Sequence, residues 1–238
     1  MIYAAIMSGG MGSRMGISDM PKQYLDLCGK PIIVRTVEKF CLCSEIKRIA
    51  VFCPQEWQTY TKDILNSYMS DEIEISRIVI AAGGKTRHDT LGKALDFIID
   101  NYGCADDDII ITHDAVRPFV NEGMIMDSVD KAAKCGAATL AVPATDTLVE
   151  SQDATLVTGS LNRSIIYHCQ TPQTFNLKKL KKLYDSFGED DAEYVTDATQ
   201  IFTLRGENVA LAKGDRRNIK ITYPHDLRIA EEILSEFK

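Results

Sequence analysis

Short apolar runs alternate with longer segments in which apolar residues recur every three or four positions, from the start of the chain to residue 142. The short runs predict buried β-strands, and the recurrence of three to four predicts amphipathic helices. The predicted strands are 2–7, 48–53, 78–82, 108–112 and 137–142. Between them we expect a helix opened by Pro31 that carries Ile33, Val37, Phe40 and Cys41, a helix over 56–68, a helix that carries Leu91, Leu95 and Ile98, and a helix capped by Asn121 that reaches Lys134.

This order of elements predicts an α/β fold over residues 1–238. Repeated strand–helix–strand units with nearly continuous apolar strands indicate a Rossmann-like, mostly parallel sheet with helices on both faces. Ligands of such sheets bind beyond the carboxyl ends of the strands. Three polar or glycine-rich segments follow strands directly and are therefore expected to meet at a binding site: 8–14, 83–89 and 113–118.

The alternation stops at an arm of about 145–161. Two short runs, 147–150 and 155–158, flank Ser151-Gln152-Asp153 and predict a protruding β-hairpin. A hairpin this small cannot bury its own apolar side chains, so Leu148 and Leu156 require a partner surface. A dimer arm is the preferred interpretation, and packing against the parent domain is the alternative.

The remaining chain predicts further helices and strands. Asn176 can cap a helix that carries Leu180, Leu183, Tyr184 and Phe187, and a second helix covers 197–204. Short strands are expected over 209–212 and 219–222. An apolar stripe then predicts a closing helix that carries Leu227, Ala230, Ile233, Leu234 and Phe237.

Composition excludes several classes of protein. The net charge of −7 argues against a general nucleic-acid binder, although a local basic cleft is compatible with it. Seven cysteines, an odd number without a Cys-x-x-Cys pair, favour reduced thiols over a disulfide framework. The sequence predicts neither a signal segment nor a membrane span, so a cytoplasmic location is expected.

A glycine-rich stretch follows the first strand: Met7-Ser8-Gly9-Gly10-Met11-Gly12-Ser13-Arg14-Met15-Gly16, with Pro21-Lys22-Gln23 shortly after it. Glycines allow backbone N–H groups to converge on a phosphate, and Arg14 and Lys22 add two cations. Walker A and dinucleotide-binding patterns both fail here, because no Gly-Lys-Ser/Thr follows and Met15 replaces the third glycine. A glycine turn with two solvated cations is the alternative to a triphosphate site.

The Gly-Gly-x-Gly-Ser-Arg-Met-Gly stretch with a downstream Pro-Lys-Gln resembles the signature loop of cytidylyltransferases that act on sugar or polyol phosphates. Two families fit, ribitol-5-phosphate cytidylyltransferase and 2-C-methyl-D-erythritol 4-phosphate cytidylyltransferase. The resemblance implies CTP as substrate, Mg²⁺ with the CTP, and a homodimer formed through the β-arm. It also implies that Arg14 and Lys22 bind and polarise the triphosphate, with CTP contacts from Met7, Ser8, Gly9, Gly10 and Gly12.

The second segment, Gly83-Gly84-Lys85-Thr86-Arg87-His88-Asp89-Thr90, resembles the base-binding loop of the same families. Cytosine offers a donor amine and an acceptor carbonyl, so backbone groups near Gly83 and Gly84 and the Thr90 hydroxyl are suitable partners. Arg87 is a further CTP contact in this comparison. The alternative is a glycine turn with Asp89 or Thr90 at a helix start.

The third segment, His113-Asp114-Ala115-Val116-Arg117-Pro118-Phe119, also resembles a family motif, and its Val116 and Phe119 are more similar to the ribitol family. Asp114 can contact CTP, bind acceptor hydroxyls or help to place Mg²⁺, which prefers oxygen ligands. Arg117 either binds the acceptor or pairs with Asp114 and holds the loop. His113 is expected to be a structural hydrogen-bonding residue.

The acceptor carries a phosphate, so a second cationic site is needed. Arg163 and Lys220 lie in segments that resemble family motifs and are the candidates for this phosphate, with Thr171 and Thr196 as hydroxyl donors. The alternative for Arg163 and Lys220 is surface solvation. If the arm is exchanged between subunits, Arg163 enters the neighbour's site.

The predicted reaction joins CTP and ribitol 5-phosphate to give CDP-ribitol and pyrophosphate, with Arg14, Lys22, Arg163 and Lys220 as the catalytic residues. An anionic phosphate oxygen is already a nucleophile, so no catalytic triad is required. CDP-ribitol would serve teichoic acid or another cell-wall polymer. The close alternative is the same transfer to 2-C-methyl-D-erythritol 4-phosphate in isoprenoid synthesis; a UTP- or GTP-dependent pyrophosphorylase and a non-catalytic nucleotide sensor are more distant ones.

Overall fold

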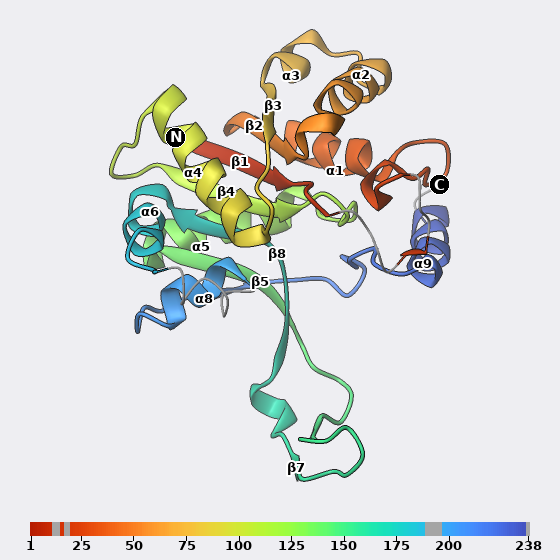
Figure 1. The fold of residues 1–238 in the computed structure, drawn as a ribbon, viewed down its shortest axis with the longest axis vertical. Helices are drawn as coiled ribbons and strands as arrows, with labels where there is room; N and C mark the ends of the chain where they lie inside the picture. The colour runs from red at the N-terminus through yellow and green to blue at the C-terminus, as the bar shows by residue number, and fades with distance from the viewer. Residues whose placement is uncertain (11–14, 17–19, 189–196, 237–238) are drawn as a thin grey trace.

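A seven-stranded sheet forms the centre of the computed structural model, which describes residues 1–10, 15–16, 20–188 and 197–236 (Figure 1). The strand order is β3-β2-β1-β4-β8-β5-β9. Neighbouring strands run parallel except at β8, which is antiparallel to β4 and β5. The strands are β1 (Ile2–Met7), β2 (Ile46–Cys53), β3 (Ile78–Ala82), β4 (Ile109–Asp114), β5 (Ala137–Pro143), β8 (Tyr167–Asn176) and β9 (Ala210–Lys213). The predicted α/β fold with a mostly parallel sheet is confirmed.

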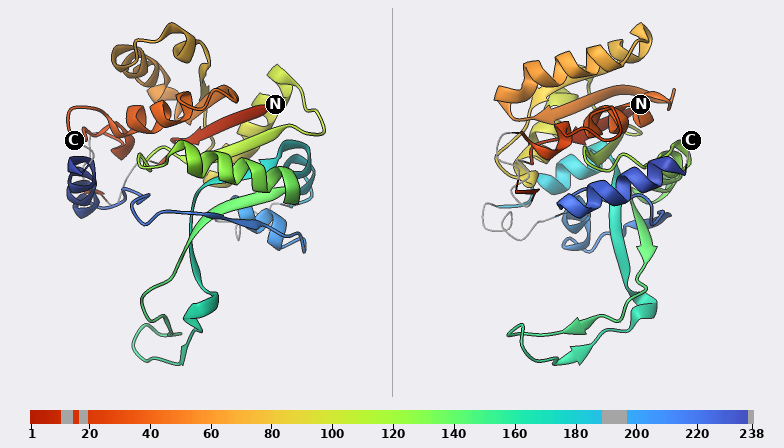
Figure 2. Two further views of the ribbon diagram at one scale, coloured as in Figure 1. Left: turned by 180° about the vertical axis from the view of Figure 1, so that it is seen from behind. Right: turned by 90° about the vertical axis from the view of Figure 1, so that its right-hand side faces the viewer.

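Helices cover both faces of this sheet, as the turned views show (Figure 2). One face packs against α1 (Ile32–Cys41), α2 (Gln58–Tyr68) and α5 (Glu122–Cys135), and the other packs against α4 (Arg87–Tyr102), α6 (Leu177–Tyr184) and α8 (Ala198–Thr203). Within β1, Ala4 and Ile6 join the first core, while Tyr3 and Ala5 join the second. Alternate residues of a strand point to opposite faces, so both faces of β1 must be apolar.

Four short helices and a closing helix complete the described structure. The short ones are the 3-10 helices η2 (Lys22–Tyr24), η3 (Gln55–Trp57) and η4 (Arg163–Ile165), and the helix α3 (Glu72–Ser76). The sequence did not predict η2, η4 or α3. The closing helix α9 (Pro224–Ser235) is confirmed, although Phe237 lies outside the described residues. Within the described ranges, no helix has both the length and the apolar composition of a membrane span.

The central strand β8 was missed because it contains Pro172, and proline argues against a central strand. The structure accommodates it through a shift in register. Thr139 of β5 pairs with Gln173, whereas the next residue, Leu140, pairs with Gln170. Pairing with β4 ends at Gln173. Pro172 therefore occupies an irregularity between two paired stretches, where its missing N–H removes no ladder hydrogen bond.

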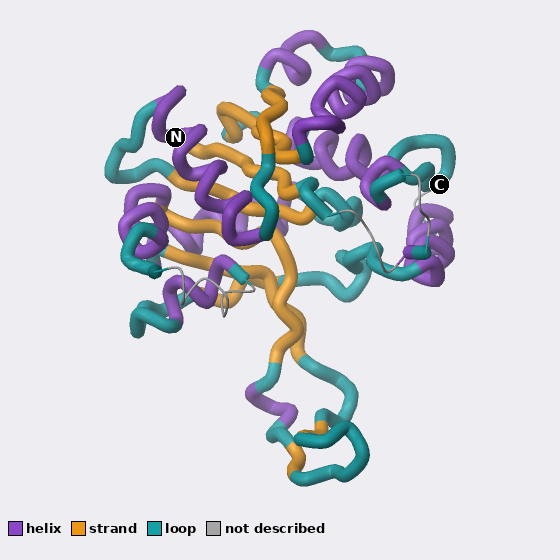
Figure 3. The backbone as a smooth tube through the Cα atoms, in the orientation of Figure 1, coloured by secondary structure: helices purple, strands orange, loops and turns teal. Residues whose placement is uncertain are grey.

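The ends of β5 and β8 leave the sheet together and lead into a protruding arm (Figure 3). Its tip holds β6 (Val149–Glu150) and β7 (Gly159–Ser160), which pair antiparallel. The predicted hairpin is confirmed, but its second strand lies later than 155–158. Asp153 accepts hydrogen bonds from the backbone N–H groups of Thr155 and Leu156, which holds this stretch in a turn.

The predicted strand over 219–222 is wrong. This segment is irregular, and its alternating apolar pattern reflects packing in a third apolar cluster rather than sheet pairing. Ile221 is fully buried, and its N–H donates to the carbonyl of Val116 at 3.0 Å. The buried members of this third cluster are Leu27, Ile32, Val116, Ile221 and Ala230. It thus fastens segments from both ends of the chain to the 113–119 loop.

We predict that Ile221→Ala lowers the free energy of unfolding by about 2–5 kcal/mol, because it leaves a cavity in the third cluster. Urea denaturation of the two proteins measures this difference. Ile229→Ala is the matched control on an exposed part of α9 and should change stability by no more than about 0.5 kcal/mol. Equal stability of the Ile221 variant and the wild type would contradict the assigned packing.

Candidate active site

The three segments expected to meet do meet at the carboxyl edge of the sheet. They border a cavity of about 280 Å³, which we call the central cavity. Segments from both ends of the chain contribute to it. The lining residues are Met7, Ser8, Gly9, Gly10, Lys22, Gln23, Gly84, Lys85, Thr86, Arg87, Thr90, Asp114, Ala115, Val116 and Lys220. Lys85 was not predicted as a site residue. Its place between Gly84 and Arg87, which were predicted to bind CTP, could have indicated it.

The segment before α4 has a closely determined backbone. A side chain at Gly84 would overlap Asp89, and its Cβ would lie 2.7 Å from the Thr90 nitrogen, so only glycine fits. The Gly84 N–H donates to the Thr90 hydroxyl at 2.9 Å, and this hydroxyl donates to the Thr86 carbonyl at 2.8 Å. Thr86 and Asp89 form a reciprocal cap. Thr90 therefore braces the loop and keeps one acceptor lone pair for other partners.

Asp114, at the end of β4, has a buried carboxylate that three cations surround. Arg87 approaches Oδ1 at 2.5 Å, while Lys220 and Arg117 approach Oδ2 at 3.0 and 3.3 Å. Burial alone would raise the pKa of this carboxyl, but Arg87, Lys220 and Arg117 together hold it well below its usual range. Three cations on one carboxylate leave positive charge in excess. With Lys22 beside them, the central cavity is suited to anions.

Arg117 makes the ion pair with Asp114 that was expected as the alternative to acceptor binding. Its side chain is only 12% exposed, and it joins Asp114 to the Asn218 carbonyl, to which Nη1 donates at 2.8 Å. The buried Asn218 side chain in turn donates to the Thr171 carbonyl at 2.9 Å. Arg117 and Asn218 therefore fasten the segment before Lys220 to the loop that carries Asp114.

His113 is fully buried and lies against Phe40. Its Nε2 lies 3.1 Å from the Arg117 carbonyl, which can only accept, so Nε2 carries the proton. Nδ1 then accepts from the Thr171 hydroxyl at 3.0 Å, and this hydroxyl accepts from the Asp114 N–H at 3.1 Å. His113 is thus the expected structural residue. The proton of Thr171, predicted to serve the acceptor, is directed to His113 in this structure.

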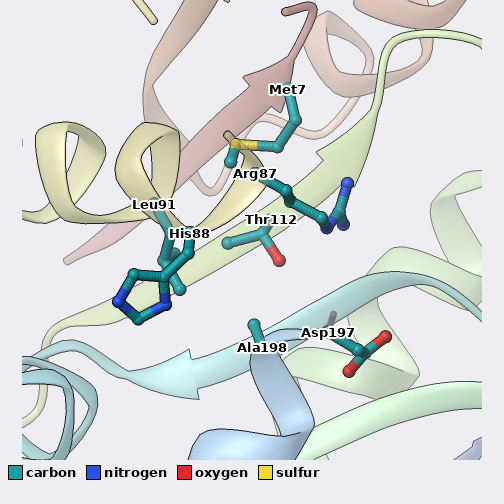
Figure 4. Close-up of a pocket in the computed structure, with 7 residues that line it drawn as sticks. All are labelled: Met7, Arg87, His88, Leu91, Thr112, Asp197 and Ala198. Carbon is teal, nitrogen blue, oxygen red and sulfur yellow. The ribbon is translucent and has the colours of Figure 1, made fainter. Parts of the chain in front are cut away.

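A second, water-sized cavity of about 10 Å³ lies beside the first (Figure 4). Met7, Arg87, Thr112 and Asp197 all border it. Asp197 caps α8 and accepts a hydrogen bond from the Gln173 amide at 2.5 Å. Asp114 foremost, and Asp197 to a smaller degree, raise the pKa of Arg87. Asp197 and Gln173 were not predicted as site residues themselves, although they lie within two positions of Thr196 and Thr171, which were predicted to serve the acceptor.

Not every predicted site residue lines the central cavity. Gly83 is not a lining residue, although its neighbour Gly84 is. Thr171 does not line the cavity either, and its hydroxyl accepts a hydrogen bond from the backbone N–H of Asp114. Arg163 lies on the exposed arm, where Nη1 donates to the Thr145 carbonyl at 2.7 Å, and it does not line the cavity of its own chain. The predictions for Gly12, Arg14 and Thr196 concern positions outside the described residues.

The donor set offers little to a resident metal ion. Among the described residues, no group of three or more His, Cys, Asp or Glu side chains could hold one. The single candidate, Asp114, already faces three cations, which a metal ion would have to displace. These residues do not fit a protein-held Mg²⁺ site. Magnesium carried by the phosphates of CTP stays a prediction.

The fold and the site define the class of this protein, an α/β nucleotidyltransferase. Solved structures with this fold include 4-diphosphocytidyl-2C-methyl-D-erythritol synthase from Anaerococcus prevotii DSM 20548, at 27% identity over 98% of this chain and 96% of that chain, with a TM-score of 0.79. Another is 2-C-methyl-D-erythritol 4-phosphate cytidylyltransferase from Francisella tularensis, at 31% identity over 97% of this chain and 98% of that chain, with a TM-score of 0.78.

The fold also matches the enzyme of the latter name from Thermus thermophilus, at 23% identity over 99% of this chain and 100% of that chain, with a TM-score of 0.72. A family model described as IspD, 2-C-methyl-D-erythritol 4-phosphate cytidylyltransferase, matches residues 2–236. The chain therefore belongs to this family, and it is a CTP-dependent cytidylyltransferase.

We predict a pH-dependent stability that depends on His113. Burial lowers the pKa of its imidazole to about 3, so the folded protein keeps it neutral. The stabilisation is fully present above the unfolded pKa of about 6.5 and is lost as the pH falls toward 3. Between pH 7.5 and pH 5 the wild type should lose about 2 kcal/mol more unfolding free energy than His113→Gln does.

Urea denaturation at the two pH values measures this difference. His225→Gln is the control, because His225 is exposed on α9 and the variant retains His113. It should keep the wild-type dependence on pH. A His113→Gln protein whose stability falls as steeply as that of the wild type would contradict the neutral, buried imidazole.

Proposed function

We propose that this enzyme transfers CMP from CTP to 2-C-methyl-D-erythritol 4-phosphate and releases pyrophosphate. The observation that carries this choice of acceptor is the family match over residues 2–236, together with the names of the similar structures at 27% and 31% identity. The central cavity, with cations around Asp114 and Lys22 nearby, supports a reaction between two phosphorylated substrates.

Ribitol 5-phosphate, the acceptor first favoured by the sequence, is the second candidate. Part of the sequence preference came from Val116 and Phe119. Val116 does line the central cavity, where it can contact the acceptor. Phe119 instead packs against the third apolar cluster, so packing accounts for its identity. The structure thus weakens one of the residue-level reasons for ribitol, whereas the family comparison supports methylerythritol phosphate.

In the proposed reaction, an anionic oxygen of the acceptor phosphate attacks the α-phosphorus of CTP. A new P–O bond forms as the bond to the β-phosphate oxygen breaks, and pyrophosphate departs with that electron pair. Lys22 neutralises charge that develops on the triphosphate and Arg87 contacts CTP, while Lys220, oriented by Asp114, attracts the second phosphate. No proton has to be removed from the nucleophile, which agrees with a neutral, buried His113.

A side-by-side assay decides the acceptor. Pyrophosphate release is measured with CTP and each of the two polyol phosphates, and then with UTP, GTP and ATP in place of CTP. We expect the highest kcat/KM for CTP with methylerythritol phosphate. A higher kcat/KM with ribitol 5-phosphate would replace the proposed acceptor. Pyrophosphate release from CTP that neither polyol phosphate stimulates would refute both acceptors.

We predict that Lys22→Ala lowers kcat by about 100- to 1000-fold, because a fixed cation that acts on developing charge contributes mainly in the transition state. Lys22 is only 8% exposed and lies in the central cavity. The melting temperature should stay close to that of the wild type. Lys62→Ala, on the exposed face of α2, is the matched control. A well-folded Lys22 variant with wild-type kcat would refute this role.

The arm supports a second part of the proposal, a homodimer. Leu156, Val157 and Ile165 are 67%, 66% and 71% exposed, and two-residue strands cannot cover them. We propose that a second copy of the chain covers these side chains and that Arg163 reaches its active site. Arg163 begins η4 on the arm, which protrudes from the body of the molecule (Figure 1), and it does not line the central cavity of its own chain.

Mixing two impaired variants, assayed at an acceptor concentration below the wild-type KM, tests this exchange. Arg163→Ala should raise the KM for the acceptor and leave CTP binding intact. When Arg163→Ala and Lys22→Ala chains are refolded together, mixed dimers contain one site with both residues, so activity should exceed that of either parent. Activity that stays at the parental level, or a monomer in analytical ultracentrifugation, would contradict the exchange.

A further inference from the structure

Gln23 lines the central cavity, yet the reaction described so far assigns it no role. Its side chain is 1% exposed, and Nε2 donates to the carbonyl of Ser8 at 2.8 Å. A carbonyl oxygen can only accept, so the amide must present its NH₂ group here. The bond lies at the edge of the cavity, because Ser8 lines it as well.

This hydrogen bond joins two segments that are separated by fifteen positions in the sequence. Ser8 follows β1 directly, and its N–H donates to the Phe52 carbonyl of β2 at 2.8 Å, so its backbone remains attached to the sheet. Gln23 belongs to η2, whose first residue is Lys22. The Gln23 amide therefore ties η2, and with it the backbone of Lys22, to the sheet edge that leads into Gly9 and Gly10.

Tyr24, the last residue of the same short helix, makes a separate set of contacts. Its ring stacks on Trp57 with centroids 5.0 Å apart, and its hydroxyl lies 2.8 Å from the Thr61 hydroxyl of α2. Neither Trp57 nor Thr61 lines the central cavity. Tyr24 thus anchors η2 to the body of the protein, whereas the Gln23 bond ends on a residue of the cavity itself.

We infer that Gln23 is a positioning residue for nucleotidyl transfer, which holds Lys22 at the correct place relative to the Ser8–Gly10 loop. The inference rests on the proposed function, in which that loop and Lys22 bind the triphosphate. Gln23 acts through the Ser8 carbonyl and need not touch the substrate. Displacement of a catalytic group by about 1 Å can cost on the order of 100-fold in rate.

Gln23→Met tests the inference, because methionine has a similar length and no donor. We expect kcat to fall by about 10- to 100-fold, the acceptor KM to stay unchanged, and the affinity for CTP to fall relative to that for CMP. Calorimetry measures the two affinities. Gln55→Met, at an exposed position of η3, is the control and should match the wild type. Wild-type kcat, or equal losses for CTP and CMP, would overturn the inference.

Gln23→Glu tests the donor itself. An ionised carboxylate cannot donate to Ser8, whereas a protonated carboxyl can, and burial raises the pKa of a carboxyl. The ratio of variant to wild-type kcat should therefore rise as the pH falls. A ratio that does not change with pH would exclude the hydrogen bond as the cause.

The two proposals fail in different ways. A wild type that releases no pyrophosphate with either polyol phosphate refutes the proposed acceptors, and the comparison of CTP with CMP then decides the role of Gln23. A wild type that turns over, beside a Gln23→Met variant with the same kinetics and affinities, refutes the inference alone.

Discussion

The ion-pair cluster around Asp114 is the interaction on which the rest of the site depends. A carboxylate on a side chain that is only 6% exposed would be costly without partners, and three cations from different parts of the chain supply them. Arg87 belongs to α4, Arg117 to the loop after β4, and Lys220 to the segment before α9. The carboxylate therefore holds together groups that would otherwise repel one another, and it does so where two anionic substrates are proposed to meet.

Apolar packing makes this arrangement possible. The third apolar cluster joins the segment after η2, the loop after β4 and α9, so the segments that carry Lys22 and Lys220 share one anchor. Ile221 stands next to Lys220 and is fully buried. Burial of the neighbouring residue limits where the lysine can be, because a core side chain has few alternative positions. The electrostatics of the site thus rest on contacts that carry no charge.

Much of this architecture could be predicted from sequence, because the first five strands and the helices between them are long and strongly patterned. The meeting of residues 8–10, 84–90 and 114–116 at one edge follows from the parallel sheet alone. Strand β8 could not be predicted, because Pro172 argues against a strand unless the register shift at Thr139 is known. The segment 219–222 was predicted as a strand but is irregular. Its apolar residues alternate because they pack in the third cluster, and this alternation is the same as that of a strand.

The roles of individual site residues were less predictable than the location of the site. Residue type alone left Arg117 divided between acceptor binding and an ion pair, and the ion pair with Asp114 and the hydrogen bond to Asn218 became visible only in the structure. Gln23 follows Lys22 in the sequence, but residue type does not predict its hydrogen bond to Ser8. That bond joins segments that are fifteen positions apart. The proposed acceptor rests on the family comparison and not on a contact within the site.

A double-mutant cycle on Asp114 and Lys220 tests the central claim most directly. The unfolding free energies of the wild type, Asp114→Asn, Lys220→Met and the double variant are measured by urea denaturation at neutral pH. The ion pair at 3.0 Å predicts a coupling free energy between about 0.5 and 3 kcal/mol, reduced by added salt because Lys220 is partly exposed. Additive effects, with no coupling at low salt, would contradict an active site organised around the Asp114 carboxylate.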